Sequence, residues 1–489
     1  MRHMFVRLVK TIALIALLSL AILLAWAFES RSMSALRIWH TAVLESEFAA
    51  ADATPQTTLQ DYLDRETELF EELEEKVYER TPPTDELIYN RYRGGGLQDP
   101  ASLEQNWNRT FELVPQQIKG GVLLLHGLTD SPYSLRRVGE ILYARGYYVL
   151  GLRLPGHGTI PGSLTRVRWQ DWVAASQIGA RHVRERIGVQ QPLIIAGYSN
   201  GGGLAVKYAL DALNALDDSK LPVPDRLLLF SPEIGIAPVA DIANSHKLLS
   251  FLPYFEQFKW LSIEPEYDPF KYNSFPKNAA QEAWAVTAEV HRQIEAAHEG
   301  GRFQDFPDVL TFLSWSDATV KTSATVQRLY DKLENEGSEL VIFDVNRASR
   351  LSPFIPASNA SPLGRLEASS DLPYRLTVIT NATSDSLQIV EKSKASRSAM
   401  IESRPLPMTW PRGVYSLAHV AIPFAPDDPV YGTGDSQSGP YHGLPLGALQ
   451  PRGETHLLTT SLGQLMRLRH NPFFDYMEQR IVEDIDKAQ

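Results

Sequence analysis

The chain has 489 residues, 44% of them hydrophobic and 10% aromatic, so it can bury a large core and is neither disordered nor of low complexity. Its formal net charge of -11 offers no basic field for a phosphate backbone, which argues against a nucleic-acid partner. The sequence contains no cysteine, and this excludes disulfides, thiolate nucleophiles and cysteine-bound zinc.

The N-terminus carries an uncharged apolar run, TIALIALLSLAILLAWAF, from Thr11 to Phe28. This run is about long enough to cross a bilayer as a helix, and the basic residues before it favour a cytoplasmic N-terminus. We therefore expect residues 1–29 to be a single-pass transmembrane anchor that holds the catalytic body on the extracytoplasmic side. A cleaved signal peptide, and hence a secreted protein, is the alternative, because Ala25-Trp26-Ala27 has the small-x-small form of a cleavage site.

Residues 30–115 are a polar, acidic lead-in to the catalytic domain. Within it, the segment 59–79 places apolar residues at helical spacing, and its acidic face is typical of a solvated helix surface. Pro82-Pro83 ends this helix, and the three glycines 94–96 mark a turn. We expect the catalytic domain to cover residues 116–489.

From residue 119 onward, short apolar strands alternate with amphipathic helices, and this predicts an α/β fold with a mainly parallel sheet covered by helices. The alternation is interrupted at 236–305, a predicted cap insertion rich in aromatic residues. Those residues are either the core of the cap or the lining of an apolar substrate pocket. A second excursion, 346–413, contains an alternating stretch, YRLTVITNATSDSLQIVEK, that predicts an added β-hairpin.

The segment Gly197-Tyr198-Ser199-Asn200-Gly201 follows the apolar run PLIIA and precedes GGLAV, so a serine stands between a strand and a helix. The G-x-S-x-G spacing is that of a nucleophile elbow, where glycines on either side of the serine let strand and helix approach closely. Ser199 is therefore the predicted nucleophile.

The first strong strand ends in Leu124-Leu125-His126-Gly127-Leu128, where the His-Gly pair turns the backbone toward the nucleophile. We assign the oxyanion hole to the backbone N–H groups of Leu128 and Asn200. His126 is expected to bond loop backbone and to take no part in proton transfer.

In this type of serine triad the residues follow one another along the chain as Ser, then Asp or Glu, then His, so the acid follows a later strand. Asp317, directly after the strand VLTFLSW, is the best placed, and Glu233 and Asp344 are its competitors. Its carboxylate would orient the catalytic histidine and stabilise the imidazolium.

Four histidines lie downstream of Asp317: His419, His442, His456 and His470. His419 stands in an apolar segment broken by prolines, where a loop after a strand can bring the ring to the serine, and we take it as the base. His456 is the next candidate. The Asp427-Asp428 pair that follows His419 is expected to form a turn.

These segments resemble the α/β-hydrolase superfamily, within it the monoacylglycerol lipase, carboxylesterase and serine-aminopeptidase-like branch. HGLTDSPYSLRRVGEILYARGYYVLGLRLPGHG is similar to the oxyanion segment and the following PGHG strand end of that branch, GYSNGG to its elbow and FLSWSDATV to its acid strand. The excursion before His419 departs from the pattern.

The resemblance implies acyl transfer to water through an acyl-enzyme on Ser199, with no metal or organic cofactor. An ester of lipid-like or other acyl type is the expected substrate. Three alternatives stay open: a peptide-directed aminopeptidase-like hydrolase, a catalytically silent binding protein on the same fold, and an acyltransferase.

Overall fold

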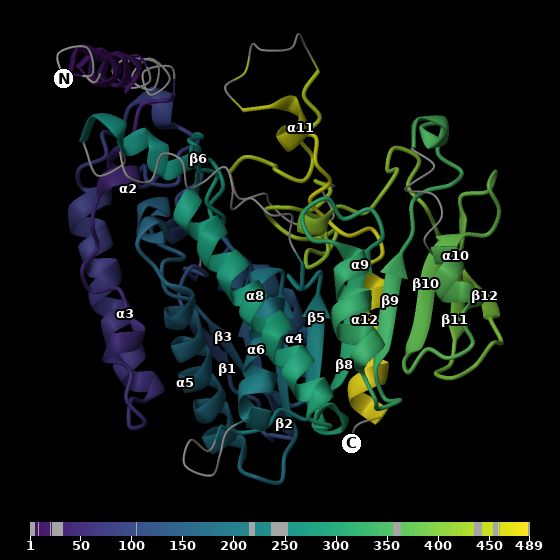
Figure 1. Ribbon diagram of the computed structural model, residues 1–489. Coiled ribbons are helices and arrows are strands. Elements are labelled where there is room, and N and C mark those ends of the chain that lie inside the picture. Colours follow the sequence, from purple (N-terminus) through teal and green to yellow (C-terminus); the bar gives the residue numbers. More distant parts are fainter. Residues whose placement is uncertain are drawn as a thin grey trace.

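The computed structural model describes residues 5–7, 9–19, 21, 33–103, 105–214, 221–235, 253–355, 363–434, 443–452, 458 and 460–487. Its centre is one ten-stranded sheet with the strand order β1-β3-β2-β4-β5-β8-β9-β10-β11-β12 (Figure 1). The strands are β1 Phe111–Leu113, β2 Gly120–Leu125, β3 Tyr147–Leu152, β4 Leu193–Tyr198, β5 Arg226–Phe230, β8 Asp308–Ser314, β9 Glu339–Phe343, β10 Arg375–Asn381, β11 Gln388–Lys394 and β12 Glu402–Thr409.

The run from β3 to β10 is parallel throughout, and only β1, β11 and β12 pair antiparallel with their neighbours. The predicted mainly parallel sheet is therefore confirmed. Each residue of β2 is buried, as expected for a parallel strand with helices on both faces.

Two helical layers cover the sheet, and alternate residues of a strand face each of them. Leu123 and Leu125 of β2 pack with residues of α3, α5, α6 and α8, whereas Val122 and Leu124 pack with residues of α4 and α12. The helices are α2 Ile38–Thr41, α3 Leu59–Leu73, α4 Arg136–Ala144, α5 Trp169–Ile187, α6 Asn200–Asn214, α8 Lys277–Glu299, α9 Thr322–Ala324, α10 Leu363–Ala368, α11 Leu462–Leu465 and α12 Phe474–Lys487.

The predicted lead-in helix is present as α3, and it continues into one π-helical turn, Glu74–Tyr78. It starts at Thr58, whose hydroxyl accepts the N–H of Asp61 while the Asp61 carboxylate accepts the N–H of Thr58. The acidic face is not entirely solvated. Glu66 is buried and forms an ion pair with the buried Arg153 at 3.1 Å.

The described part of the cap interval has two components. Strands β6 (Trp260–Ser262) and β7 (Phe275–Pro276) form a small antiparallel ribbon. The long helix α8 then packs along α6 and is the crossover that leads from β5 into the parallel strand β8. Most of the interval's described aromatic side chains are buried, and Trp284 is exposed. Phe251 lies outside the described residues, as do the side chains of Tyr254 and Phe255.

The second excursion extends the central sheet. Its β10 pairs with β9 in parallel, and β11 and β12 add two antiparallel strands at the right of Figure 1. The predicted hairpin is thus β10–β11. The chain then returns to its point of departure, because Val345 and Ser416 form an antiparallel bridge and the N–H of Asn346 donates to the carbonyl of Tyr415 at 2.8 Å.

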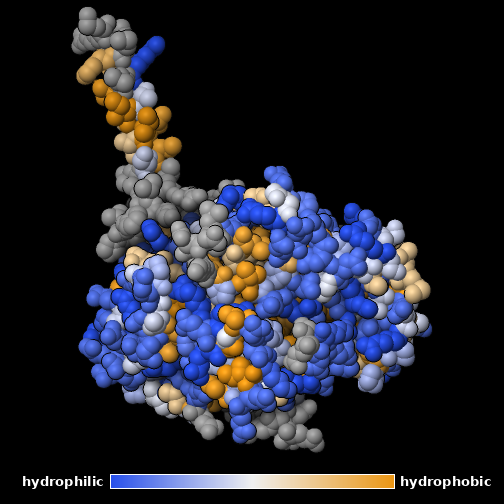
Figure 2. All heavy atoms as spheres, turned by 90° about the horizontal axis from the view of Figure 1, so that it is seen from below, coloured by the Kyte–Doolittle hydropathy of each residue, from blue (hydrophilic) through white to orange (hydrophobic). Residues whose placement is uncertain are grey.

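The N-terminal segment is helical over residues 5–7, 9–19 and 21, and Figure 2 shows its apolar side chains standing out from the body. Among the described residues, no helix combines the length and the apolar character that a membrane crossing requires. Of the predicted span 11–28, residue 20 and residues 22–28 lie outside the described residues.

Candidate active site

Ser199 stands on the sharp turn between β4 and α6. Its φ of 53° lies in the left-handed region that residues with a side chain rarely adopt. A Cβ on Gly197 would come within 2.3 Å of the Gly201 carbonyl oxygen, and one on Gly201 within 2.0 Å of the Leu125 carbonyl oxygen. Both glycines are therefore required for this close approach of strand, turn and helix.

The structure brings Ser199, His419 and Asp317 into one hydrogen-bonded chain. The Ser199 hydroxyl lies 3.0 Å from Nε2 of His419, and Nδ1 of His419 donates to Oδ2 of Asp317 at 2.7 Å. The three come from different places. Ser199 follows β4, Asp317 follows β8, and His419 follows the return from β12. The first two reach the same edge of the sheet because the carboxyl ends of parallel strands share an edge.

The surroundings of Asp317 favour its ionised form. Burial alone would raise the pKa of this carboxyl, but the charge and hydrogen bond of His419 hold the pKa below its ordinary value. The N–H groups of Thr319 and Val320 also donate to Oδ1, at 2.8 and 3.0 Å, so that Oδ2 is left for the histidine. A buried, ionised carboxylate is suited to stabilise an imidazolium at His419.

The loop after β2 is held by His126, whose ring nitrogens both bond backbone. Leu154 donates its N–H to Nε2 at 3.0 Å, so Nδ1 carries the proton and donates to the Gly127 carbonyl at 2.9 Å. Burial, with a smaller contribution from His157, lowers the pKa of His126 well below its ordinary value. The ring is neutral and both of its nitrogens are hydrogen-bonded to backbone, which agrees with a structural role for His126.

The backbone N–H groups of Leu128 and Asn200 remain available for an oxyanion. Among the described residues, neither group has a hydrogen-bond acceptor, whereas the N–H of Asp130 donates to the Gly127 carbonyl and that of Ser199 donates to the Phe230 carbonyl. Asn200 is the first residue of α6, where the N–H groups point out of the helix and carry its positive dipole end.

The competing acids have other surroundings. Asp344 pairs with Arg347 at 2.6 Å and accepts the Thr380 hydroxyl at 2.7 Å, so its carboxylate holds the start of the second excursion. Glu233 donates its N–H to the Ser199 carbonyl at 2.9 Å, but its carboxyl is buried beside Thr287. Burial raises the pKa of Glu233 to about 8.

Of the competing histidines, His470 lies among the described residues, and it has no hydrogen bond to Ser199 there. His470 is half-buried, and burial lowers the pKa of its ring. His442 and His456 lie outside the described residues. Asp428 forms the expected turn by accepting the N–H groups of Val430 and Tyr431 at 2.9 and 2.8 Å.

Sequence reasoning did not single out Asp130 and Lys271, which meet beside the loop that carries Leu128. Lys271 Nζ lies 3.2 Å from both carboxylate oxygens of Asp130. The available signal was an acidic residue in the loop that directly follows a buried strand, but its partner is 141 residues away in the sequence.

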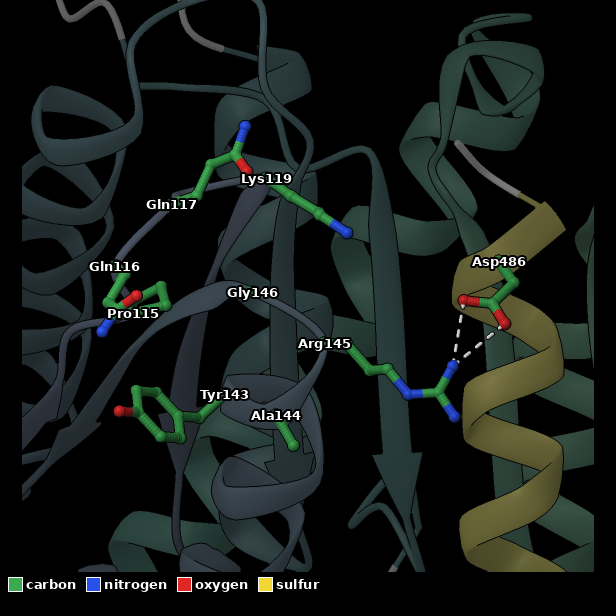
Figure 3. A pocket seen from close by; sticks show the side chains of 9 residues that line it. All are labelled: Pro115, Gln116, Gln117, Lys119, Tyr143, Ala144, Arg145, Gly146 and Asp486. Atoms are coloured by element: carbon green, nitrogen blue, oxygen red, sulfur yellow. Dashed lines mark hydrogen bonds and ion pairs between the residues drawn. The ribbon is translucent and has the colours of Figure 1, made fainter.

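A surface cavity of about 460 Å³ lies far from these residues (Figure 3). Its walls come from segments that precede β2 and β3 and from α12, so it opens at the amino ends of the strands, opposite the edge that carries Ser199. Arg145 and Asp486 form an ion pair in its wall at 3.2 Å. Within the described part of the chain, no cluster of three or more His, Asp or Glu side chains could hold a metal ion.

Comparison with known proteins finds one family model and one lipase to which parts of the chain are similar. Residues 122–358 match the model of the alpha/beta hydrolase family. A stretch of 89 residues is 38% identical to a thermostable monoacylglycerol lipase from Bacillus sp. (strain H-257), and this stretch is 18% of the chain and about a third (34%) of the lipase.

Two solved structures are similar at lower identity. The monoacylglycerol lipase of Paleococcus ferrophilus is 16% identical, with 46% of this chain and 84% of that chain covered and a TM-score of 0.34. A soluble variant of monoglyceride lipase from Saccharomyces cerevisiae is 15% identical, with 46% and 77% covered and a TM-score of 0.31.

Proposed function

We propose that this chain, an α/β-hydrolase of the monoacylglycerol lipase and esterase branch, is a membrane-anchored serine hydrolase that cleaves carboxylic esters through an acyl-enzyme. The observation that carries the proposal is the chain of hydrogen bonds from Ser199 through His419 to Asp317, with the serine on a strained elbow. Strained backbone at a reactive side chain is typical of a catalytic site.

In the proposed mechanism, His419 Nε2 takes the hydroxyl proton of Ser199 as Oγ attacks the ester carbonyl. The N–H groups of Leu128 and Asn200 bind the oxyanion of the tetrahedral intermediate. The imidazolium, stabilised by Asp317, then returns the proton to the leaving alcohol, and the acyl group stays on Ser199. Water deprotonated by His419 attacks the acyl-enzyme, the acid leaves and Ser199 regains its proton.

The similarity to a monoacylglycerol lipase favours an ester substrate over an amide. The proposed anchor is residues 11–28, of which the described helical part exposes large apolar side chains, Leu17 at 67% among them. Apolar side chains exposed in this way are suited to lipid. The catalytic body would lie on the extracytoplasmic side, and cleavage after Ala27 would give a secreted form instead.

The test uses the full chain in detergent, a fluorophosphonate probe and an ester panel of short to long acyl chains. Ser199→Ala and His419→Ala should abolish labelling and turnover, and Asp317→Asn should lower kcat by about 10²–10⁴-fold, because an amide cannot hold the productive tautomer. Intact labelling of Ser199→Ala would refute the proposal, and labelling that survives His419→Ala would assign the base to another histidine.

Ser231 provides the matched control. It is also buried, has a positive φ of 41°, and follows the neighbouring strand β5. Its N–H donates to Phe312 as that of Ser199 does to Phe230. Ser231→Ala should leave labelling and turnover unchanged.

A further inference from the structure

The loop His126–Asp130, which carries Leu128, is fixed at both ends. At its start, the His126 ring bridges Leu154 and Gly127, as described above. At its end, the N–H of Asp130 donates to the Gly127 carbonyl at 3.2 Å and closes a turn. The N–H of Leu128 lies between these two fixed points, so its direction depends on both.

The second fixed point is strained and is held from outside the loop. Thr129 has a φ of 65°, which is costly for a β-branched residue. Its carbonyl accepts the N–H of Tyr272 at 2.8 Å. Lys271 Nζ binds both carboxylate oxygens of Asp130, whose side chain is only 5% exposed. Two consecutive residues of another segment therefore oppose the strain.

The segment that supplies Lys271 is itself rigid. Oδ1 of Asp268 accepts the N–H groups of Phe270 and Lys271, both at 3.1 Å. The Phe270 ring stacks on Tyr133 with ring centroids 3.9 Å apart and an interplanar angle of 6°. Because the backbone of Lys271 is held in this way, the ion pair can impose a position on Asp130.

A second set of bonds joins this segment to the PGHG loop after β3. The Tyr272 hydroxyl accepts the N–H of Thr159 at 2.7 Å and donates to the Gly156 carbonyl at 3.2 Å. The PGHG loop also begins beside Leu154, which holds His126. Both fixed points of the Leu128 loop thus connect to one framework.

From these contacts we infer that Lys271 is a positioning residue of the oxyanion hole, which acts through Asp130 on the direction of the Leu128 N–H. The inference rests on the proposed function and adds a residue to it. Without Lys271, the buried Asp130 carboxylate has lost its cation and must take up a proton or turn toward water. Either change releases the strained Thr129 and lets the neighbouring N–H swing out of line.

The test compares Lys271→Met with Lys271→Arg, using a neutral ester. Lys271→Met should lower kcat roughly 10- to 100-fold while KM stays within about twofold, because the lost interaction acts on the transition state. Lys271→Arg should recover most of the rate, since a guanidinium reaches the same carboxylate. The double variant Asp130→Asn with Lys271→Met should lower kcat no further than Lys271→Met alone.

Lys332 is the matched control, because it is equally exposed at 25% and pairs with Glu295 at 3.1 Å, away from the site. Lys332→Met should leave kcat unchanged. A wild-type kcat in a folded Lys271→Met variant would overturn the inference, as would a rise in KM confined to anionic esters, which would make Lys271 a substrate contact. If Ser199→Ala retains turnover, the proposed function fails; if Ser199→Ala abolishes it and Lys271→Met does not lower it, only the role of Lys271 fails.

Discussion

At the scale of single residues, two buried carboxyl groups, those of Asp317 and Glu233, differ in protonation state. The Asp317 carboxylate is ionised because His419 and two backbone N–H groups replace the water that burial removes. The Glu233 carboxyl is also buried, and among the described residues only the Thr287 side chain opposes the effect of burial, so its pKa is raised to about 8. Glu233 is therefore protonated near neutral pH.

This difference predicts a pH-dependent stability. Between pH 4.5 and 8 the folded state keeps the Glu233 proton while the unfolded state has lost it, so the free energy of unfolding falls by up to about 1.4 kcal/mol per pH unit. Glu233→Gln removes this slope. Urea unfolding is measured at pH 5, 6.5, 8 and 9. The free energy of unfolding of the variant, relative to that of the wild type, should rise from pH 5 to pH 8 and then stay constant. Parallel curves for the two proteins would contradict the assignment.

At the scale of elements, the elbow depends on how closely α6 approaches β2 and β4. A methyl group on Gly201 would lie 2.0 Å from a backbone carbonyl that cannot yield without moving β2. In α10, by contrast, a methyl group on Gly364 would meet nothing within 4 Å. The same substitution therefore tests packing at one glycine and backbone entropy at the other.

Gly201→Ala should lower turnover by at least about 100-fold through misplacement of Ser199, or prevent folding. Gly364→Ala should keep full turnover and raise the free energy of unfolding by up to about 1 kcal/mol, because alanine favours a helix. Thermal unfolding and ester turnover check both. Normal activity of Gly201→Ala would show that β2 and α6 can separate.

The added strands β10–β12 lengthen the sheet and leave β12 as its edge. Pro405 and Pro407 lack N–H donors, and Arg404 is paired with Glu391 at 2.8 Å, so this edge is poorly suited to pairing with another chain. The insertion leaves His419 in place because its two ends meet at the bridge between Val345 and Ser416.

At the scale of the whole molecule, the lead-in is bound to the α/β body. Arg153, at the end of β3, pairs with Glu66 of α3 and with Glu47, and also donates to the His157 carbonyl at 3.1 Å. The lead-in thus braces the PGHG loop. Its first helix, α2, contacts the short 3-10 helix Pro161–Thr165 that follows this loop, at the edge of the sheet that carries Ser199 (Figure 1).

This arrangement predicts where the proposed anchor holds the enzyme. Only nine residues, 29–37, separate the apolar run from α2, and they span at most about 30 Å. The body would thus be held close to the membrane. Because the proposed anchor crosses the bilayer, the full chain should stay with membranes through salt and carbonate washes and be released by detergent. Leu17→Arg should weaken this retention, because a charge in a membrane span is costly.

Leu351→Arg, at a residue exposed elsewhere, is the control and should not change retention. Release of the wild-type chain by salt alone would contradict the anchor. An N-terminus at residue 28 in the mature protein would show that the segment is cleaved.

Local patterns in the sequence were enough to predict the parallel sheet, the elbow and the lead-in helix. The reason is that each depends on neighbours in the chain: apolar periodicity selects strand or helix, and glycine spacing permits the turn at Ser199. The same locality limited the other predictions. Glu66 was assigned to a solvated face because no residue near it in the sequence indicates its contact with Arg153, which is 87 residues away.

Only the tertiary structure decided which histidine meets the acid. Asp317 and His419 are 102 residues apart, and their contact depends on an insertion whose ends return to one point. The bond between Asp130 and Lys271 likewise joins segments 141 residues apart. The catalytic role of Ser199, Asp317 and His419 stays a prediction, but their convergence is a property of the packed chain: long-range contacts arise from how elements fit together, which spacing along the sequence does not encode.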